Sequence, residues 1–258
     1  MSYAPIVLLR QGSVRYELLA GASACPGIYQ QSSELLAMSF HLHEPMTTAT
    51  GVTIDAHRDF FDMMMPQMCD NGLSVVALES NAEAGDAGAS ASDTVLGVFI
   101  AEDFAALMPS GSSGLDGFME KHGEGPMAST LALLDQVEED LKAKLALAST
   151  GGVGGADVPR GQYCHLWCVG VDERAQGRGI AKALSQLVLQ QAAQQGFGLS
   201  FAEATGEYSA RALAKVGMVE TAVYLYKEWE MEPGSGVRPF AGTAEPHIGT
   251  RLMEIQHH

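Results

Sequence analysis

The sequence has few cysteines, little positive charge and no long apolar run. Its four cysteines form no CxxC pair, which excludes a zinc ribbon. The first apolar run ends at Arg10 and is too short for the core of a signal peptide. No stretch approaches the roughly eighteen apolar residues that a membrane span needs. We therefore expect a cytoplasmic protein with free thiols and no membrane partner.

The scarcity of positive charge restricts the partners. Lys and Arg number 15 against 31 Asp and Glu, which gives a formal net charge of -16. Such a field repels nucleic acid and anionic lipid, and it concentrates small cations such as protonated amines. The sequence thus favours a small-molecule amine as partner, and it gives no indication of the oligomeric state.

The 258 residues, 47% of them hydrophobic, suffice for one domain with a large core. No repeat or linker divides the chain, so we predict a single domain over residues 1–258. Residues 103–160 are interpreted as an insertion. Gly- and Ser-rich stretches at 110–126 and 150–161 flank one amphipathic helix, whose apolar stripe is Leu133, Leu134, Val137, Leu141 and Leu145.

Hydrophobic periodicity predicts the remaining elements. The first half has a helix around 32–40 that is entered at Pro26, a helix at 55–68 that Pro66 stops, and a hairpin of strands 73–78 and 95–101 around a polar loop at 80–93. The second half reads as strand 165–171, a glycine turn, helix 180–195, strand 198–202, helix 209–216, and strands 219–229 and 251–255. This order predicts a mixed sheet with helices on its faces.

The glycine turn, residues 174–179, is the candidate anion site. It joins a buried strand to a helix start, where free backbone N–H groups and the helix dipole favour a pyrophosphate. Gly177 and Gly179 let a ligand approach, while Arg174 and Arg178 add positive charge. Lys182 stands where a dinucleotide-binding motif has its third glycine. The Gly-Lys-Ser or Gly-Lys-Thr sequence of a Walker loop is absent. The alternative is a turn that binds nothing.

The segment 171–181 resembles the acetyl-CoA motif (R/Q)xxGx(G/A) of the GNAT N-acetyltransferases, and 208–218 is similar to that family's second helix. The resemblance implies an α/β, mixed α+β fold: a central mixed, mostly antiparallel sheet flanked by helices, with the helical insertion before the central strand. It implies acetyl-CoA as acyl donor and no metal. The matching cofactor-binding positions are Cys168, Val169, Val171, Arg174, Gln176, Gly177, Arg178, Gly179, Ile180 and Ala181.

Two further segments look like the insect-type arylalkylamine N-acetyltransferases. Residues 43–46 resemble a motif whose glutamate, here Glu44, is the proposed general base. Residues 205–211 are similar to a stretch with two catalytic serines, matched here by Thr205 and Ser209, and Tyr208 is a second-choice proton donor. The implied reaction is direct attack of a primary amine on the thioester in a ternary complex.

The sequence departs from the family motifs at three positions, and two of the candidate catalytic residues have structural alternatives. Leu213 replaces a tyrosine acid common in the superfamily, Glu173 replaces a proline, and His43 replaces an acidic residue. Glu44 before Pro45 could simply end a helix, and Ser209 could be an N-cap.

Other readings concern the site chemistry and the substrate. His41, His43 and Glu44 could form a metal cluster if they lie on a strand. Cys164 and Cys168 would lie on the same side of a strand, where a catalytic thiol is possible but inert packing is usual. His247 could line the substrate pocket. The acceptor could be a polyamine, an amino acid or a protein N-terminus, or the chain could be a non-catalytic acyl-CoA-binding module.

Overall fold

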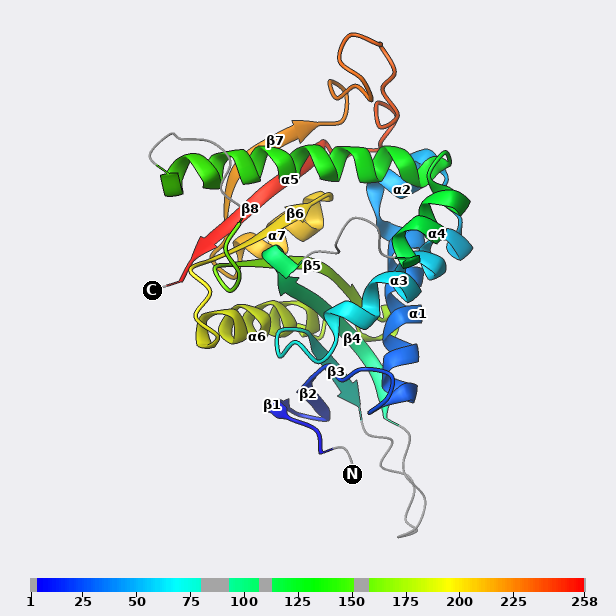
Figure 1. Cartoon of the computed structure of the whole chain (residues 1–258). Coiled ribbons are helices and arrows are strands. Elements are labelled where there is room, and N and C mark those ends of the chain that lie inside the picture. Colours follow the sequence, from blue (N-terminus) through cyan, green and yellow to red (C-terminus); the bar gives the residue numbers. More distant parts are fainter. Residues whose placement is uncertain (1–3, 80–92, 107–112, 151–157, 258) are drawn as a thin grey trace.

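The computed structural model describes residues 4–79, 93–106, 113–150 and 158–257. One eight-stranded sheet runs in the order β1-β2-β3-β4-β5-β6-β8-β7 (Figure 1). Its strands are β1 (Val7–Gln11), β2 (Val14–Leu18), β3 (Val75–Glu79), β4 (Thr94–Asp103), β5 (Tyr163–Val171), β6 (Leu199–Ala204), β7 (Val219–Leu225) and β8 (Gly249–Gln256). All neighbours pair antiparallel except β5 and β6, which are parallel. The mixed, mostly antiparallel sheet is confirmed, and the β1–β2 hairpin was not predicted.

Helices cover both faces of this sheet. They are α1 (Pro26–His43), α2 (Pro45–Thr50), α3 (Ile54–Met68), α4 (Ser113–His122), α5 (Pro126–Thr150), α6 (Ile180–Gln194) and α7 (Glu207–Ala214). Helices α6 and α7 bury their apolar stripes on one face, while α1 and α3 cover the other. Helix α5 crosses that second face over β6 and β8 (Figure 1). In the described part of the chain, no helix has the length and apolar character of a membrane span.

Helix α3 corrects the expectation that Pro66 stops it. The helix continues to Met68 with Pro66 inside its last turn. A proline there deprives only one carbonyl of its N–H partner, and the buried methionines Met64, Met65 and Met68 keep the turn packed against the sheet. Packing therefore outweighs the local effect of the proline.

The segment 103–160 contains two helices, α4 and α5, where the sequence predicted one. The stripe of α5 is as expected: Leu133, Val137 and Leu141 are buried, with Leu134 and Leu145 packed against them. Helix α4 lies in the Gly- and Ser-rich stretch predicted to be a tether, and its Phe118 packs with Val52 and Ala56. Residues 110–112 of the first predicted tether, residues 151–157 of the second, and residues 80–92 of the predicted loop lie outside the described residues.

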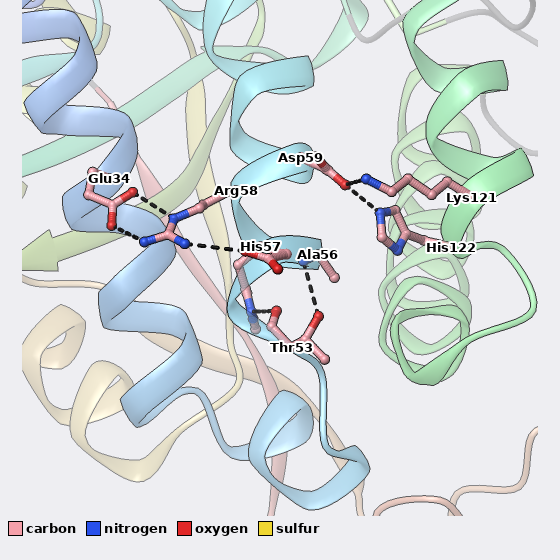
Figure 2. A network of polar contacts seen from close by, with 9 residues as sticks. Glu34, Thr53, Ala56, His57, Arg58, Asp59, Lys121 and His122 are labelled. Atoms are coloured by element: carbon pink, nitrogen blue, oxygen red, sulfur yellow. Dashed lines mark hydrogen bonds and ion pairs between the residues drawn. The ribbon is translucent and has the colours of Figure 1, made fainter.

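A polar network ties α3 to its two neighbours (Figure 2). Arg58 donates to both carboxylate oxygens of Glu34 on α1, at 2.6 and 2.9 Å. On the other side Asp59 accepts from Lys121 and His122 of α4. Because these ion pairs are largely exposed, they contribute little to the stability of the protein, and we infer that they mainly orient the helices. They hold α1, α3 and α4 together as one wall.

A β-bulge interrupts β5 opposite β4. Ile100 pairs with Cys168, but the next residue, Ala101, pairs with Leu166, so Trp167 is extra. The bulge turns the strand over: Cys164 packs on the α6 face, whereas Cys168 packs on the α1 face. The parity that the spacing predicted for these two cysteines is therefore wrong.

Candidate active site

A cavity of about 980 Å³ lies where β5 and β6 separate. The two parallel strands pair over Tyr163–His165 and Leu199–Phe201. Beyond these residues β5 stays with β4, and β6 stays with β8. The lining comes from both faces of the sheet, with Phe40 and Glu44 from the α1 side and Ser185 and Leu213 from the α6 and α7 side. Two substrates could thus enter from opposite faces and meet between the strands.

Glu44 brings a carboxylate to this cavity. It ends α1 and caps α2, because Pro45 cannot continue the first helix and begins the second. Its Oε1 accepts from the N–H of Met46 at 3.1 Å, and its Oε2 accepts from the N–H of Thr47 at 2.5 Å. The helix-end interpretation is therefore confirmed, and it coexists with the position in the cavity.

The electrostatics of Glu44 suit a base. The side chain is 7% exposed. Burial raises the pKa of this carboxyl, opposed by hydrogen bonds from the two backbone N–H groups and from the Thr205 hydroxyl. A carboxylate whose pKa is raised is a stronger base than an ordinary carboxylate. The arrangement gives the cavity one buried, hydrogen-bonded proton acceptor.

Tyr226 fixes Thr205 in this arrangement. Its hydroxyl donates to the carbonyl oxygen of Thr205 at 2.5 Å, and it lies 3.3 Å from the hydroxyl of Thr250. The residue is 1% exposed. Burial and the nearby carboxyl of Glu44 raise the pKa of this phenol, so it stays neutral. A neutral phenol can keep donating to Thr205 across the physiological range.

Helix α7 carries the two candidate proton donors. Its N-cap is Gly206, not Ser209, which lies at the third helical position and whose hydroxyl donates to the carbonyl of Gly206 at 2.8 Å. The same hydroxyl oxygen accepts from the N–H of Gly206 at 3.3 Å. Tyr208 is 66% exposed and its ring packs edge-on against His247. Ser209, Tyr208 and His247 all line the cavity.

The glycine turn adopts the strand-to-helix geometry that was expected. A single 3₁₀ turn at Glu173–Ala175 overlaps its start, and α6 begins at Ile180. Gly177 and Gly179 have φ of 75° and 79°, and a Cβ at either position would meet no atom within 4 Å. Their role in this structure is the left-handed backbone conformation, not a close approach. Gly179 is the N-cap of α6, so its flanking N–H groups remain available to an anion.

The two arginines of the turn are already paired with carboxylates. Arg174 donates to Asp172 at 2.6 and 2.9 Å, and Arg178 donates to Glu79 at 2.7 Å. These exposed ion pairs are weak and exchange readily with a dianionic ligand. The positive charge that the sequence predicted is present, although each guanidinium would exchange a carboxylate for a phosphate.

Of the residues predicted for the cofactor, the cavity lining includes Cys168, Val169, Val171, Gln176 and Ala181. Gly177, Arg178 and Gly179 lie in the adjoining turn, Ile180 is buried in the α6 core, and Arg174 lines a neighbouring hollow beside α1. All four amine-side candidates, Glu44, Thr205, Tyr208 and Ser209, line the cavity. The structure therefore brings most of the predicted residues to one place.

The profile of the Acetyltransferase (GNAT) family matches residues 132–218. The search of curated proteins gives no significant match. Among solved structures, arylalkylamine N-acetyltransferase 2 from Aedes aegypti is 18% identical with a TM-score of 0.67, covering 96% of this chain and 100% of its own. The Drosophila melanogaster polyamine N-acetyltransferase that forms N-acetylagmatine is 19% identical with a TM-score of 0.64, covering 94% and 99%. The chain has the GNAT fold. The resemblance expected from the sequence is confirmed at this level.

Two alternative sites do not form on this GNAT fold. His41 and His43 lie on helix α1, not on a strand, and they bond to different partners, Val52 and Glu173. Across the described ranges no three His, Cys, Asp or Glu side chains are grouped to hold a metal ion. Burial raises the pKa of the Cys164 thiol to about 12 and that of Cys168 well above its ordinary value, so neither is a nucleophile at neutral pH.

Sequence reasoning missed several residues that line or support the GNAT cavity. Trp167 lines it from the bulge, and no sequence signal marks a bulge. Glu203 lines it from β6, and Tyr226 supports it by its hydrogen bond to the carbonyl oxygen of Thr205. A charged residue inside an apolar strand, as in Leu199–Ala204, is a signal that could have singled out Glu203.

Proposed function

We propose that this protein is an acetyl-CoA-dependent N-acetyltransferase whose acceptor is a small primary amine of the arylalkylamine class. The single observation that carries the proposal is the buried carboxylate of Glu44 in a cavity between two separated strands, next to a glycine turn suited to a pyrophosphate. The GNAT fold supports acyl transfer as the reaction type.

Glu44 acts as the general base in this proposal. A primary amine with a pKa near 10.4, the ordinary value for Lys, is almost fully protonated at pH 7. The carboxylate takes this proton, directly or through a water molecule, and frees the nitrogen lone pair. The hydroxyl of Thr205 and the N–H groups of Met46 and Thr47 hold the carboxylate in position.

The free amine then attacks the thioester carbonyl of acetyl-CoA. The new C–N bond forms as the carbonyl becomes an oxyanion, and a backbone N–H of β5 near Cys168–Val171 stabilises it. The nitrogen, which is cationic once the C–N bond has formed, gives up its second proton to water; the oxyanion then collapses, the C–S bond breaks, and the CoA thiolate leaves. Ser209 is the proposed donor of the proton that this thiolate takes up, with Tyr208 as the second choice; both line the cavity.

The cavity lining supports an aromatic amine. Phe40, Trp167 and Tyr208 lie on its wall together with Glu44, so an apolar ring and an ammonium group would both find partners. The net charge of -16 favours the same cationic class. The four free cysteines fit the cytoplasm as the place of action.

Glu44→Gln tests the proposal. Release of thiol from acetyl-CoA with tyramine as acceptor should fall by about 10²–10⁴-fold at pH 7 and recover partly at high pH, where the free amine is abundant. Unchanged kinetics would remove Glu44 from the mechanism. Binding of CoA without amine-dependent thiol release in the unaltered protein would indicate a non-catalytic acyl-CoA-binding module.

Thr53→Ala is the matched control. Thr53 caps α3 by accepting from the N–H of Ala56, as Glu44 caps α2, but it does not line the cavity. Loss of this cap should lower stability by about 1 kcal/mol and leave kcat unchanged. A similar loss of kcat in both variants would mean that Glu44 acts through helix capping alone.

A further inference from the structure

The indole of Trp167 forms part of the cavity wall. Trp167 is the extra residue of the β5 bulge, and it packs on the α1 and α3 side of the sheet together with its neighbour Cys168. On a regular strand these two successive side chains would point to opposite faces. The bulge therefore turns the indole to the α3 side just beyond the point where β5 leaves β6, and there it lines the cavity.

Two phenylalanines of α3 pack against this indole. The ring of Phe60 stacks on it, with the ring centroids 5.3 Å apart and the planes at 27°. Phe61 meets it edge-on, at 6.4 Å. Neither phenylalanine is among the described residues that line the cavity, whereas Trp167 is, so the indole lies between Phe60 and the cavity. Phe60 thus occupies one face of the indole, and the opposite face is left for a ligand.

A further aromatic contact holds Phe60 itself. Phe118 of α4 lies 5.4 Å from Phe60, with the planes tilted by 52°, and His122 lies 4.8 Å from Phe118 on the same helix. His122 in turn bonds to Asp59 of α3 at 2.7 Å (Figure 2). The rings of Trp167, Phe60 and Phe118 form a continuous row from the cavity to α4. The plane of the indole is therefore set before any substrate binds.

A fixed indole face is suited to an aromatic ring. Stacked and edge-on aromatic pairs are stabilised beyond the burial of their apolar area. A side chain that is already ordered loses little freedom on binding, so little of this gain is offset. Tyr208 also lines the cavity, but it is 66% exposed and its ring would lose more freedom. Trp167 is for this reason the stronger candidate for a ring contact.

We propose that Trp167 is a specificity residue that stacks on the aromatic ring of the acceptor, and that Phe60 is the positioning residue that orients its indole. The ammonium group of the acceptor lies at Glu44 and its ring on Trp167, which line the same cavity. This inference rests on the proposed acetyltransferase function and refines its substrate class, because the site then prefers an aromatic ring to a saturated ring of the same size.

A matched pair of acceptors tests the inference by thiol release from acetyl-CoA at pH 8. Phenylethylamine and 2-cyclohexylethylamine have the same carbon skeleton, but only the first has an aromatic ring. Their amines differ in basicity, so the informative quantity is the ratio of the two kcat/KM values, compared between proteins. This ratio should be about two- to tenfold higher in the unaltered protein than in Trp167→Leu. An equal ratio in the two proteins would overturn the inference.

Three further variants separate specificity from structure. Trp167→Phe keeps an aromatic face and should keep most of the ratio. Phe60→Leu should lower the ratio through KM for phenylethylamine, with KM for acetyl-CoA unchanged, and an unchanged ratio would remove Phe60 from the proposal. Trp229→Leu is the matched control, because Trp229 also stacks on a phenylalanine, Phe240, at 5.3 Å and 30°, but is not among the described residues that line the cavity. An equal fall of the ratio in Trp229→Leu and Trp167→Leu would assign Trp167 a purely structural role.

The fluorescence of Trp167 tests the contact without catalysis. The chain has two tryptophans, so Trp229→Leu leaves Trp167 as the only one. With CoA in place of acetyl-CoA, phenylethylamine should change this emission saturably, and adding Phe60→Leu should raise the concentration needed. Emission that stays constant up to millimolar phenylethylamine would overturn the inference. A saturable change in emission without thiol release from acetyl-CoA would refute the proposed acetyltransferase function and leave the ring contact standing.

Discussion

The hydroxyl of Tyr226 donates a 2.5 Å hydrogen bond to the carbonyl oxygen of Thr205. Through this bond the segment after β7 holds the end of β6 in the place where the Thr205 hydroxyl reaches Glu44. Tyr226 thus fixes the environment of a carboxylate that lies 182 residues earlier in the sequence.

Tyr226→Phe should lower stability by about 1–2 kcal/mol, because a buried carbonyl loses its donor. It should also lower kcat while leaving KM for acetyl-CoA unchanged. Thermal unfolding and thiol-release kinetics measure the two effects. Tyr224→Phe is the control, since that hydroxyl bonds to the exposed Asp140 outside the cavity. An unchanged kcat in Tyr226→Phe would show that Thr205 needs no such support.

Gly179→Ala should weaken acetyl-CoA binding. The alanine would have to hold a φ of 79°, at a cost of about 1 kcal/mol, and the N-terminus of α6 would shift to relieve it. Gly196→Ala carries a similar strain, with a φ of 86° and open space around the Cβ, just after the opposite end of α6. Both variants should lose similar stability, but only Gly179→Ala should raise KM for acetyl-CoA. Equal KM values would contradict an anion site at this turn.

A buried charge cluster, in which His165 lies between Glu203 and Glu102 with Glu138 nearby, predicts that stability falls as pH rises. The pKa of Glu138 is raised by burial to about 7 in the folded protein, so its contribution is fully present below the ordinary value of 4.5 and is lost as pH rises through 7. The pKa of His165 is raised to about 10, so its contribution is present below 6.5 and is lost as pH rises through 10.

Urea unfolding between pH 5 and 10 measures both contributions. Glu138→Gln should flatten the fall near neutral pH, and His165→Gln should flatten the alkaline part. Parallel pH profiles in all three proteins would contradict the charge assignment of this cluster.

The sequence predicted what depends on local patterns. The glycine turn before Ile180, the apolar stripe of α5 and the position of Glu44 before Pro45 follow from periodicity, turn chemistry and proline geometry, and these elements form as expected. The family resemblance added the prediction that the glycine turn and Glu44 belong to one acetyl-transfer site.

Features that depend on strand pairing could not be predicted. The bulge at Trp167 exists only relative to β4, and it decides which face Cys168 occupies and where β5 leaves β6. The cluster of Glu203 with His165 and Glu102 likewise joins residues from three strands. The sequence did not predict helix α4 because its glycines weaken the helical pattern, and because its Phe118 is buried by residues of other elements, among them Val52, Ala56 and Phe60.

The central claim is that this cavity transfers an acetyl group from acetyl-CoA to a small amine. Thiol release from acetyl-CoA measured against tyramine, dopamine, serotonin, phenylethylamine, spermidine and a few amino acids tests it most directly. We expect turnover with the arylalkylamines, rising with pH as the fraction of unprotonated amine increases. Turnover with spermidine or an amino acid alone would contradict the arylalkylamine class, and no thiol release with any acceptor would contradict the central claim itself.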